Sequence, residues 1–247
     1  MAQSEVYLSL IIPAYNEAER LAGTLRRSQE YLSQKPFSYE MIVVLDGPTD
    51  NTREVLEGLT SEIKHLRLLD CKVNHGKGYA VKKGMLRARG RVRLYSDADN
   101  STDISHFDGM VPLFDKGYDI VICSRHSKDA PGARQNVPQA WHKRVMGKAG
   151  NIFIQLVAVM GIRDTQCGFK AFRDHAAEKI FSQTVITRWG FDVEVLALAR
   201  ELKYKIGIIP ADWINDPRSH VNLRAYFDVL RDTVKVRWNI FQGRYKR

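Results

Sequence analysis

Short apolar runs alternate with amphipathic stretches along most of the chain. Short apolar runs that end in proline or an acid are typical of buried strands, and apolar positions repeated every three or four residues are typical of helices. After the first run, for example, Leu21, Leu25 and Leu32 fall on one helical face. The pattern predicts strands at residues 7–13, 39–46, 65–69, 92–96, 118–124, 167–172 and 206–210, helices at 18–32, 52–59, 80–89, 107–116, 141–160, 176–181, 191–202 and 223–241, and loops at 74–79 and 125–139.

Strand and helix alternate through the first half of this order, which favours right-handed strand–helix–strand units and a parallel sheet. Ligands of such sheets bind beyond the carboxyl ends of the strands. Residues 13–17, Asp46 and residues 97–99 all lie at the carboxyl ends of predicted strands, so we expect three polar clusters on one rim. The sequence therefore predicts an α/β fold with a mainly parallel central sheet and helices on both faces. Residues 1–222 are predicted to form one domain, and residues 223–247 a basic amphipathic C-terminal helix.

Composition and charge narrow the class of partner. The 38 Lys and Arg residues outnumber the 28 Asp and Glu residues, which gives a formal net charge of +10. Such a charge favours nucleic acid, an acidic membrane surface or phosphorylated substrates. The three cysteines have no metal-ligand spacing and form no disulfide framework, so a reducing compartment is expected. We expect no signal peptide, and the longest uncharged apolar run, residues 151–162, is too short to cross a bilayer.

Two carboxylates one residue apart, Asp97 and Asp99, end the strand predicted at residues 92–96. Oxygen donors that converge at a strand end suit a divalent cation that serves a substrate diphosphate. Asn100 and Ser101 follow them, and the same residues also suit a turn or a helix cap. The sequence has no glycine-rich dinucleotide motif, no P-loop and no serine-nucleophile elbow.

Several motifs occur in the order found in family 2 inverting glycosyltransferases. They are Ile-Ile-Pro-Ala-Tyr-Asn-Glu at residues 11–17, Asp-Gly-Pro-Thr-Asp-Asn-Thr at 46–52, Asn-His-Gly-Lys-Gly-Tyr-Ala at 74–80 and Ser-Asp-Ala-Asp at 96–99. Residues 123–125, 163–170 and 188–194 resemble the dolichyl-phosphate glucosyltransferase branch, close to the polyprenyl-phosphate mannose synthases. The resemblance spans residues 7–213 and implies the GT-A fold, a nucleotide-sugar donor and a divalent metal, Mg²⁺ or Mn²⁺.

The resemblance also implies roles for residues on the rim. Asp46 would accept a hydrogen bond from the nucleotide base, Lys77 would approach the sugar donor, and Asp99 would ligate the metal. Asp97 would face the ribose and the metal, with Ser101 as a weaker metal ligand. The nucleotide sugar would be held by Pro13, Ala14, Tyr15, Glu17, Asp46, Lys77, Asp97 and Ala98. Simpler readings stay open: a packed ring for Tyr15, a helix-start acid for Glu17 and a solvated lysine for Lys77.

The acceptor can be argued from its chemistry. A hydroxyl acceptor needs a general base, whereas a phosphate monoester, with a second pKa near ~6, is already anionic and needs cations to hold it. Arg125 and Arg144 resemble the family's phosphate-binding arginines, and their forks match phosphate. With Asp99 they are the predicted catalytic residues. Arg134 and Arg188 are further candidates for binding the acceptor phosphate. Asp192 is the one candidate general base for a hydroxyl acceptor.

The chain departs from the family pattern in three places. One acid, Asp46, stands where two consecutive acids are common in the family. Near the C-terminus, Arg218-Ser219-His220 replaces the family's Gly-Ser-Lys. Arg218 would therefore substitute for that lysine in binding the acceptor phosphate. We also expect no N-terminal membrane anchor of the kind that eukaryotic members carry. Membrane contact would then fall to the C-terminal helix, whose aromatic and cationic residues suit an anionic bilayer. That helix packing on the domain, or forming a homo-oligomer contact, is the alternative.

The prediction is thus an inverting, metal-dependent enzyme, peripheral on the cytoplasmic face of a membrane, that moves a hexose onto a polyprenyl phosphate. Glucose from UDP-glucose is the first candidate; GDP-mannose as donor or a glycan hydroxyl as acceptor are the alternatives. A non-catalytic basic module for membranes or nucleic acid is another class. Carboxylates on the rim argue against a polyanion groove, so no nucleic-acid partner is expected.

Overall fold

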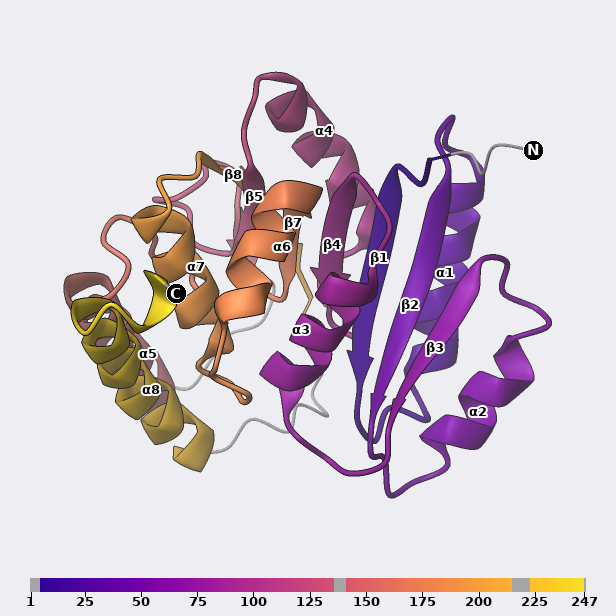
Figure 1. Ribbon diagram of the computed structural model, residues 1–247, viewed down its shortest axis with the longest axis horizontal. Coiled ribbons are helices and arrows are strands. Elements are labelled where there is room, and N and C mark those ends of the chain that lie inside the picture. The colour runs from indigo at the N-terminus through magenta and orange to yellow at the C-terminus, as the bar shows by residue number, and fades with distance from the viewer. Residues whose placement is uncertain (1–4, 136–140, 215–222, 247) are drawn as a thin grey trace.

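One seven-stranded, mainly parallel sheet forms the centre of the molecule (Figure 1). The computed structural model describes residues 5–135, 141–214 and 223–246. The strand order is β3-β2-β1-β4-β7-β5-β8, and β7 runs antiparallel to both of its neighbours while the other pairs are parallel. The strands are β1 Leu8–Ala14, β2 Tyr39–Asp46, β3 Leu66–Cys71, β4 Val92–Ser96, β5 Ile120–Ser124, β7 Phe169–Arg173 and β8 Ile206–Pro210. The predicted α/β architecture is confirmed.

Helices cover both faces of this sheet because its strands are apolar on both sides. Leu10 and Ile12 of β1 pack into the core beneath α1 and α4, whereas Ile11 packs into the core beneath α3, α6 and α7. This alternation is the period-two pattern of a strand. The helices are α1 Leu21–Ser33, α2 Thr52–Leu59, α3 Lys77–Arg87, α4 Phe107–Asp115, α5 Trp141–Val157, α6 Asp174–Gln183, α7 Phe191–Glu201 and α8 Leu223–Phe241.

Most predicted boundaries lie within three residues of those in the structure, and two of the differences have a clear physical cause or add an element. Helix α3 begins at Lys77 rather than at residue 80, because Gly76 turns the chain at a φ of 105° and the carboxylate of Asp46 accepts the backbone N–H groups just before the helix. The predicted loop at residues 125–139 contains the short strand β6 (Arg134–Gln135), which pairs with β9 (Asp212–Trp213). The part of that loop at residues 136–140 lies outside the described residues.

The C-terminal helix α8 lies beside α5 at one end of the molecule and also packs on α7 (Figure 1). Val229 and Val236 of α8 join the core that α7 helps to form. Among the helices of the described ranges, none combines the length and the apolar character needed to cross a bilayer.

Candidate active site

The carboxyl ends of β1, β2, β4 and β5 bring the predicted residues to one edge of the sheet, as the sequence predicts. Pro13 and Ala14 are the last residues of β1, and Tyr15 follows with its ring exposed. Glu17 binds Arg20 through two hydrogen bonds of 2.7 and 2.8 Å. Burial raises the pKa of Glu17 to about 7, and the nearby charges of Asp99 and Asp97 add to the rise against the opposing effect of Arg20. The β1 and β4 clusters therefore interact electrostatically across the rim.

Asp46, the last residue of β2, is buried and organises the loop that leads into α3. Its Oδ1 accepts the backbone N–H of His75 at 3.0 Å, and its Oδ2 accepts that of Gly76 at 2.7 Å. These bonds position the Gly-Lys-Gly turn over the rim, so Asp46 lies next to Lys77 in the site although 30 residues separate it from Gly76 in the chain. Each carboxylate oxygen has a second lone pair, so a contact with a nucleotide base stays a prediction for this residue.

Lys77 and Asp97 form an ion pair at the centre of the rim, with 2.5 Å between Nζ and Oδ1. Burial alone would lower the pKa of Lys77, but the charges of Asp97, Asp192 and Asp99 outweigh it and raise that pKa. Lys77 therefore faces carboxylates and is largely buried, which argues against a solvated loop lysine.

The turn after β4 is held in one shape by hydrogen bonds. The buried hydroxyl of Thr24 donates to the carbonyl of Ala98 at 2.6 Å, and the N–H of Ser101 donates to Asp99 Oδ1 at 2.9 Å. Asn100 lies in the left-handed region at a φ of 54°, which asparagine tolerates. The turn thus holds Asp99 in place, and Asp97 and Asp99 offer hard oxygen donors near a cationic group. Their chemistry fits Mg²⁺ or Mn²⁺, and no structural observation assigns a role to the hydroxyl of Ser101.

A buried ion pair lies beneath this rim. Lys170 of β7 has no exposed surface, and its Nζ contacts Oδ1 of Asp192 and the carbonyl of Cys167, each at 2.5 Å. The hydroxyl of Tyr95 donates to the same Asp192 oxygen at 2.5 Å. Asp192 is the candidate base for a hydroxyl acceptor, but it is buried and its carboxylate is bound by a lysine. The structure therefore argues against Asp192 as a general base.

Gly168 completes the site and was not singled out from the sequence. A side chain at this position would place its Cβ 2.0 Å from Asp97 Oδ2, so the carboxylate of Asp97 lies directly against the glycine backbone. The signal in the sequence is the lysine of the run Phe-Lys-Ala-Phe at residues 169–172, which is out of place in an apolar strand. That lysine fixes the Cys167 carbonyl, and with it the chain next to Gly168.

Arg125 follows β5 and is held by Asp164 through three hydrogen bonds: from its backbone N–H at 2.7 Å, from Nε at 2.8 Å and from Nη2 at 2.8 Å. Its guanidinium also lies 5.3 Å from the ring centre of Trp213. Burial would raise the pKa of Asp164, but Arg125 outweighs that effect and lowers the pKa to about 2. The bonds to Asp164 use Nε and Nη2 of the guanidinium. Within the described residues, Nη1 has no hydrogen-bond partner.

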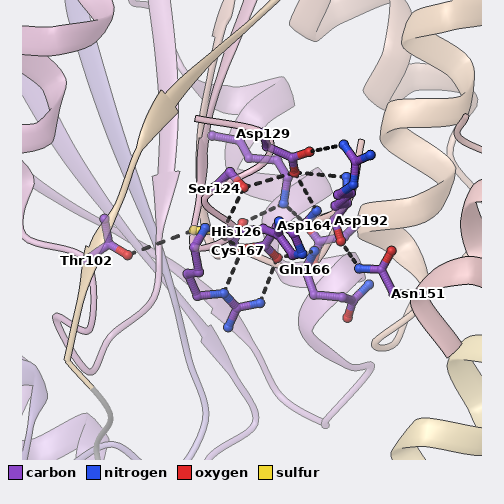
Figure 2. Close-up of polar contacts among 12 residues, drawn as sticks. Thr102, Ser124, His126, Asp129, Asn151, Asp164, Gln166, Cys167 and Asp192 are labelled. Carbon is purple, nitrogen blue, oxygen red and sulfur yellow. Dashed lines mark hydrogen bonds and ion pairs between the residues drawn. The ribbon is translucent and has the colours of Figure 1, made fainter. Parts of the chain in front are cut away.

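Asp129 binds Ser124 and the chain at residues 163 and 164, which flank this pair (Figure 2). Its Oδ2 accepts the hydroxyl of Ser124 at 3.0 Å and the backbone N–H groups of Arg163 and Asp164, both at 2.9 Å. This network ties the segment after β5 to the segment before β7, so the orientation of Arg125 is fixed by groups from two parts of the chain.

The other predicted arginines are placed in part. Arg144 lies in α5, but its side chain is outside the described residues, as is the whole of Arg218. Arg188 borders the donor side, because a Cβ at Gly76 would lie 2.8 Å from Arg188 Cγ. Arg134 lies in β6, where its N–H donates to the carbonyl of Ala211 at 2.9 Å.

Comparisons with known proteins identify the family of this chain. The family model described as glycosyl transferase family 2 matches residues 9–181. The dolichyl-phosphate beta-glucosyltransferase of Dictyostelium discoideum is 34% identical over 98% of this chain and 77% of its own, and that of Saccharomyces cerevisiae is 33% identical with the same coverage of both chains. The crystal structure of glucosyl-3-phosphoglycerate synthase from Mycobacterium tuberculosis with Mn²⁺, uridine diphosphate and phosphoglyceric acid has a TM-score of 0.67 at 16% identity, covering 97% of this chain and 78% of that one. This likeness shows a shared fold, the GT-A fold of glycosyltransferases. The chain belongs to glycosyl transferase family 2 and is a glycosyltransferase.

Proposed function

We propose that the protein transfers glucose from UDP-glucose to a polyprenyl phosphate with inversion at the anomeric carbon. The observation that carries the acceptor is Arg125: Asp164 holds its guanidinium in one orientation and leaves the Nη1 edge unbonded within the described structure. A fork held in this way suits an anionic phosphate. The choice of glucose and of a dolichol-type lipid is supported by the relatives that carry the name dolichyl-phosphate beta-glucosyltransferase.

The donor would bind along the rim. Tyr15 and Glu17 with residues 13 and 14 would hold the nucleotide, and Asp46 would accept from the base. Lys77 would leave Asp97 and bind the diphosphate, since a phosphate oxygen can replace a carboxylate as its partner. Asp97 and Asp99 would hold Mg²⁺ or Mn²⁺, which when bound stabilises the charge that develops on the leaving nucleoside diphosphate.

The transfer step needs no proton acceptor. Above pH ~6 the acceptor phosphate is a dianion. One of its oxygens forms the new bond to the anomeric carbon, while the bond from that carbon to the diphosphate breaks and leaves its electron pair on the diphosphate oxygen. Arg125, with Arg144 and Arg218 as further candidates, would hold the acceptor phosphate for this attack. The burial of Asp192 in an ion pair supports a mechanism of this kind.

We further propose that the protein lies on the cytoplasmic face of a membrane through α5 and α8. Its division into a catalytic domain at residues 1–222 and a helix at 223–247 stays a prediction. The two helices lie side by side (Figure 1), and large exposed apolar side chains lie on and next to them: Ile152 and Leu156 in α5, Met160 just after it, and Phe227, Val234, Trp238 and Phe241 in α8. Exposed cations Arg231, Lys235, Arg237 and Arg244 accompany them. Apolar and cationic groups on one surface suit an anionic bilayer.

The test of the activity is nucleoside-diphosphate release from a panel of nucleotide sugars, including UDP-glucose and GDP-mannose, with Mg²⁺ or Mn²⁺ and with or without a short polyprenyl phosphate. We expect release from UDP-glucose that requires the lipid phosphate and is lost in Asp99→Asn. Asp115→Asn is the matched control, since Asp115 is exposed at the end of α4, where β5 begins at the opposite edge of the sheet. Release that does not depend on the lipid phosphate would contradict the proposed acceptor.

The membrane proposal is tested by co-sedimentation with vesicles of neutral or anionic lipid. We expect binding to anionic vesicles that falls with added salt and is weakened in the variant Leu156→Ser with Phe241→Ser. Sedimentation velocity on the same proteins identifies the alternative, a homo-oligomer through this surface. A wild-type dimer that the double variant abolishes, with no vesicle binding, would overturn the membrane proposal.

A further inference from the structure

Three potential metal ligands of different chemistry meet at the ends of β2 and β3, beside the donor rim. The parallel register pairs Asp46 with Cys71, so these side chains leave neighbouring strands on the same face. Both are buried, at 2% and 5% exposure. His75 follows four residues later, and its Nδ1 lies 3.8 Å from Asp46 Oδ1. One ligand atom from each of the three residues lies within 4.8 Å of the other two.

The groups around this cluster hold the ligands in place. The carboxylate of Asp46 is oriented by the N–H groups of His75 and Gly76, and outer hydrogen bonds of this kind are typical of metal-binding carboxylates. The ring of His75 stacks on Tyr79, with 4.3 Å between ring centroids and 20° between planes. The ammonium of Lys83 lies 3.3 Å from Cys71 Sγ, so the sulfur already faces a cation.

The chemistry of these three ligands determines which metal ion the cluster would prefer. A thiolate and an imidazole are borderline or soft ligands that favour Zn²⁺ over Mg²⁺, Ca²⁺ or Mn²⁺. In a tetrahedral zinc site with bonds of about 2.0–2.3 Å, neighbouring donor atoms lie about 3.5 Å apart. The His75–Asp46 separation is near this value, and His75 is partly exposed and can close the remaining gap. The Asp97 and Asp99 pair offers oxygen alone, so the two sites differ in the ion that they prefer.

We propose that Asp46, Cys71 and His75 form a zinc-binding site that is distinct from the Asp97 and Asp99 pair. Three protein ligands leave a fourth position for water. Lys83 competes for the sulfur, which limits the affinity and makes the site responsive to zinc concentration. The consequence for activity rests on the proposed function: Asp46 cannot bind zinc and accept from a donor base at once, so zinc would compete with the nucleotide sugar.

The direct test is a Zn²⁺ titration of the full chain against a chromogenic chelator, without nucleotide. We expect one zinc per chain in the wild type and affinity at least about tenfold weaker in Cys71→Ser and in His75→Asn. His65→Asn is the matched control and should bind as the wild type. Lys83→Met should bind more tightly, because it removes the competing cation from the sulfur.

Equal titrations of the wild type, Cys71→Ser and His75→Asn would overturn the site, as would a loss in one of the two variants alone. His75 is on an exposed loop, so its variant remains informative if Cys71→Ser does not fold.

The consequence is tested by UDP binding with and without zinc. Zinc should weaken UDP binding to the wild type and not to Cys71→Ser. Zinc that binds without changing UDP affinity would refute the competition. A failure to bind UDP at all would refute the proposed function and leave the zinc titration unaffected.

Discussion

The substitution Gly168→Ala tests whether activity depends on the position of the Asp97 carboxylate. The alanine Cβ would lie 2.0 Å from Asp97 Oδ2, 2.4 Å from Cγ and 2.7 Å from Oδ1, whereas ordinary contacts begin at 3.4 Å. The carboxylate must therefore move from 2.0 to 3.4 Å, a displacement of about 1.4 Å. The backbone of Gly168 lies outside the left-handed region, so alanine suits its conformation. The effect of the substitution is then the displacement of one side chain.

A displacement of about 1 Å in a catalytic group costs about 100-fold in rate, or about 2.7 kcal/mol in activation free energy. We therefore expect kcat/KM for lipid-dependent UDP release to fall about 100-fold in Gly168→Ala. Binding of Mn²⁺, followed by electron paramagnetic resonance, should weaken in parallel. Because the Asp97 side chain is 32% exposed and can swing toward solvent, the free energy of unfolding should change by about 1 kcal/mol or less.

The matched control is Gly58→Ala in α2, where a Cβ meets nothing within 4 Å. Alanine should stabilise this helix by roughly 0.5–1 kcal/mol and leave activity unchanged. If Gly168→Ala has wild-type kcat/KM and Mn²⁺ binding, the position of Asp97 does not control the reaction and the reasoning from the rim fails.

Three further substitutions test the ion pairs of the site. Asp164→Asn should remove about 2 kcal/mol of stability above pH 3.8, because pairing with Arg125 lowers the carboxyl pKa from 3.8 to about 2. This contribution is lost as the pH falls toward 2, so urea unfolding from pH 7 to 2.5 should show the gap to the wild type narrowing; a constant gap would contradict the pairing. Lys170→Met should cost about 3–5 kcal/mol, since it leaves a buried carboxylate without its cation, and a cost below about 1 kcal/mol in urea unfolding would show that the pair is not held. Lys77→Gln should tighten Mn²⁺ binding in the absence of nucleotide and weaken UDP binding, both measured by calorimetry. If both affinities rise or both fall, Lys77 does not move from the Asp97 carboxylate to the diphosphate.

The sheet and its rim follow from local patterns in the sequence. Short apolar runs such as Leu8–Ala14 form the strands, and the rule that parallel strands share one carboxyl edge places Asp46 and Asp97 at the same edge of the sheet. The start of α3 was predicted too late, because the hydrogen bonds that allow it come from Asp46, which lies on another strand.

The partners of the site residues were harder to predict because they are distant in the chain. The sequence predicts Arg125 as a phosphate ligand, but the orientation of its side chain depends on Asp164, 39 residues later. Asp192 was a candidate base by residue type alone, and a lysine on a strand in the middle of the sheet removes it from that role. Residue type and order thus predict which groups reach the rim, whereas pairing among them depends on tertiary contacts.

These pairings also bear on how the enzyme would accept its substrates. Asp97 is paired with Lys77, and Asp164 with Arg125. A diphosphate that arrives without a cation would draw Lys77 away and leave Asp97 uncompensated beside Asp99, and unpaired like charges at a partly buried site are costly. A cation that arrives without a diphosphate must compete with Lys77 for Asp97. On the proposed function, binding the two together replaces both partners of the Lys77–Asp97 pair at once, so we expect the donor to bind as its metal complex.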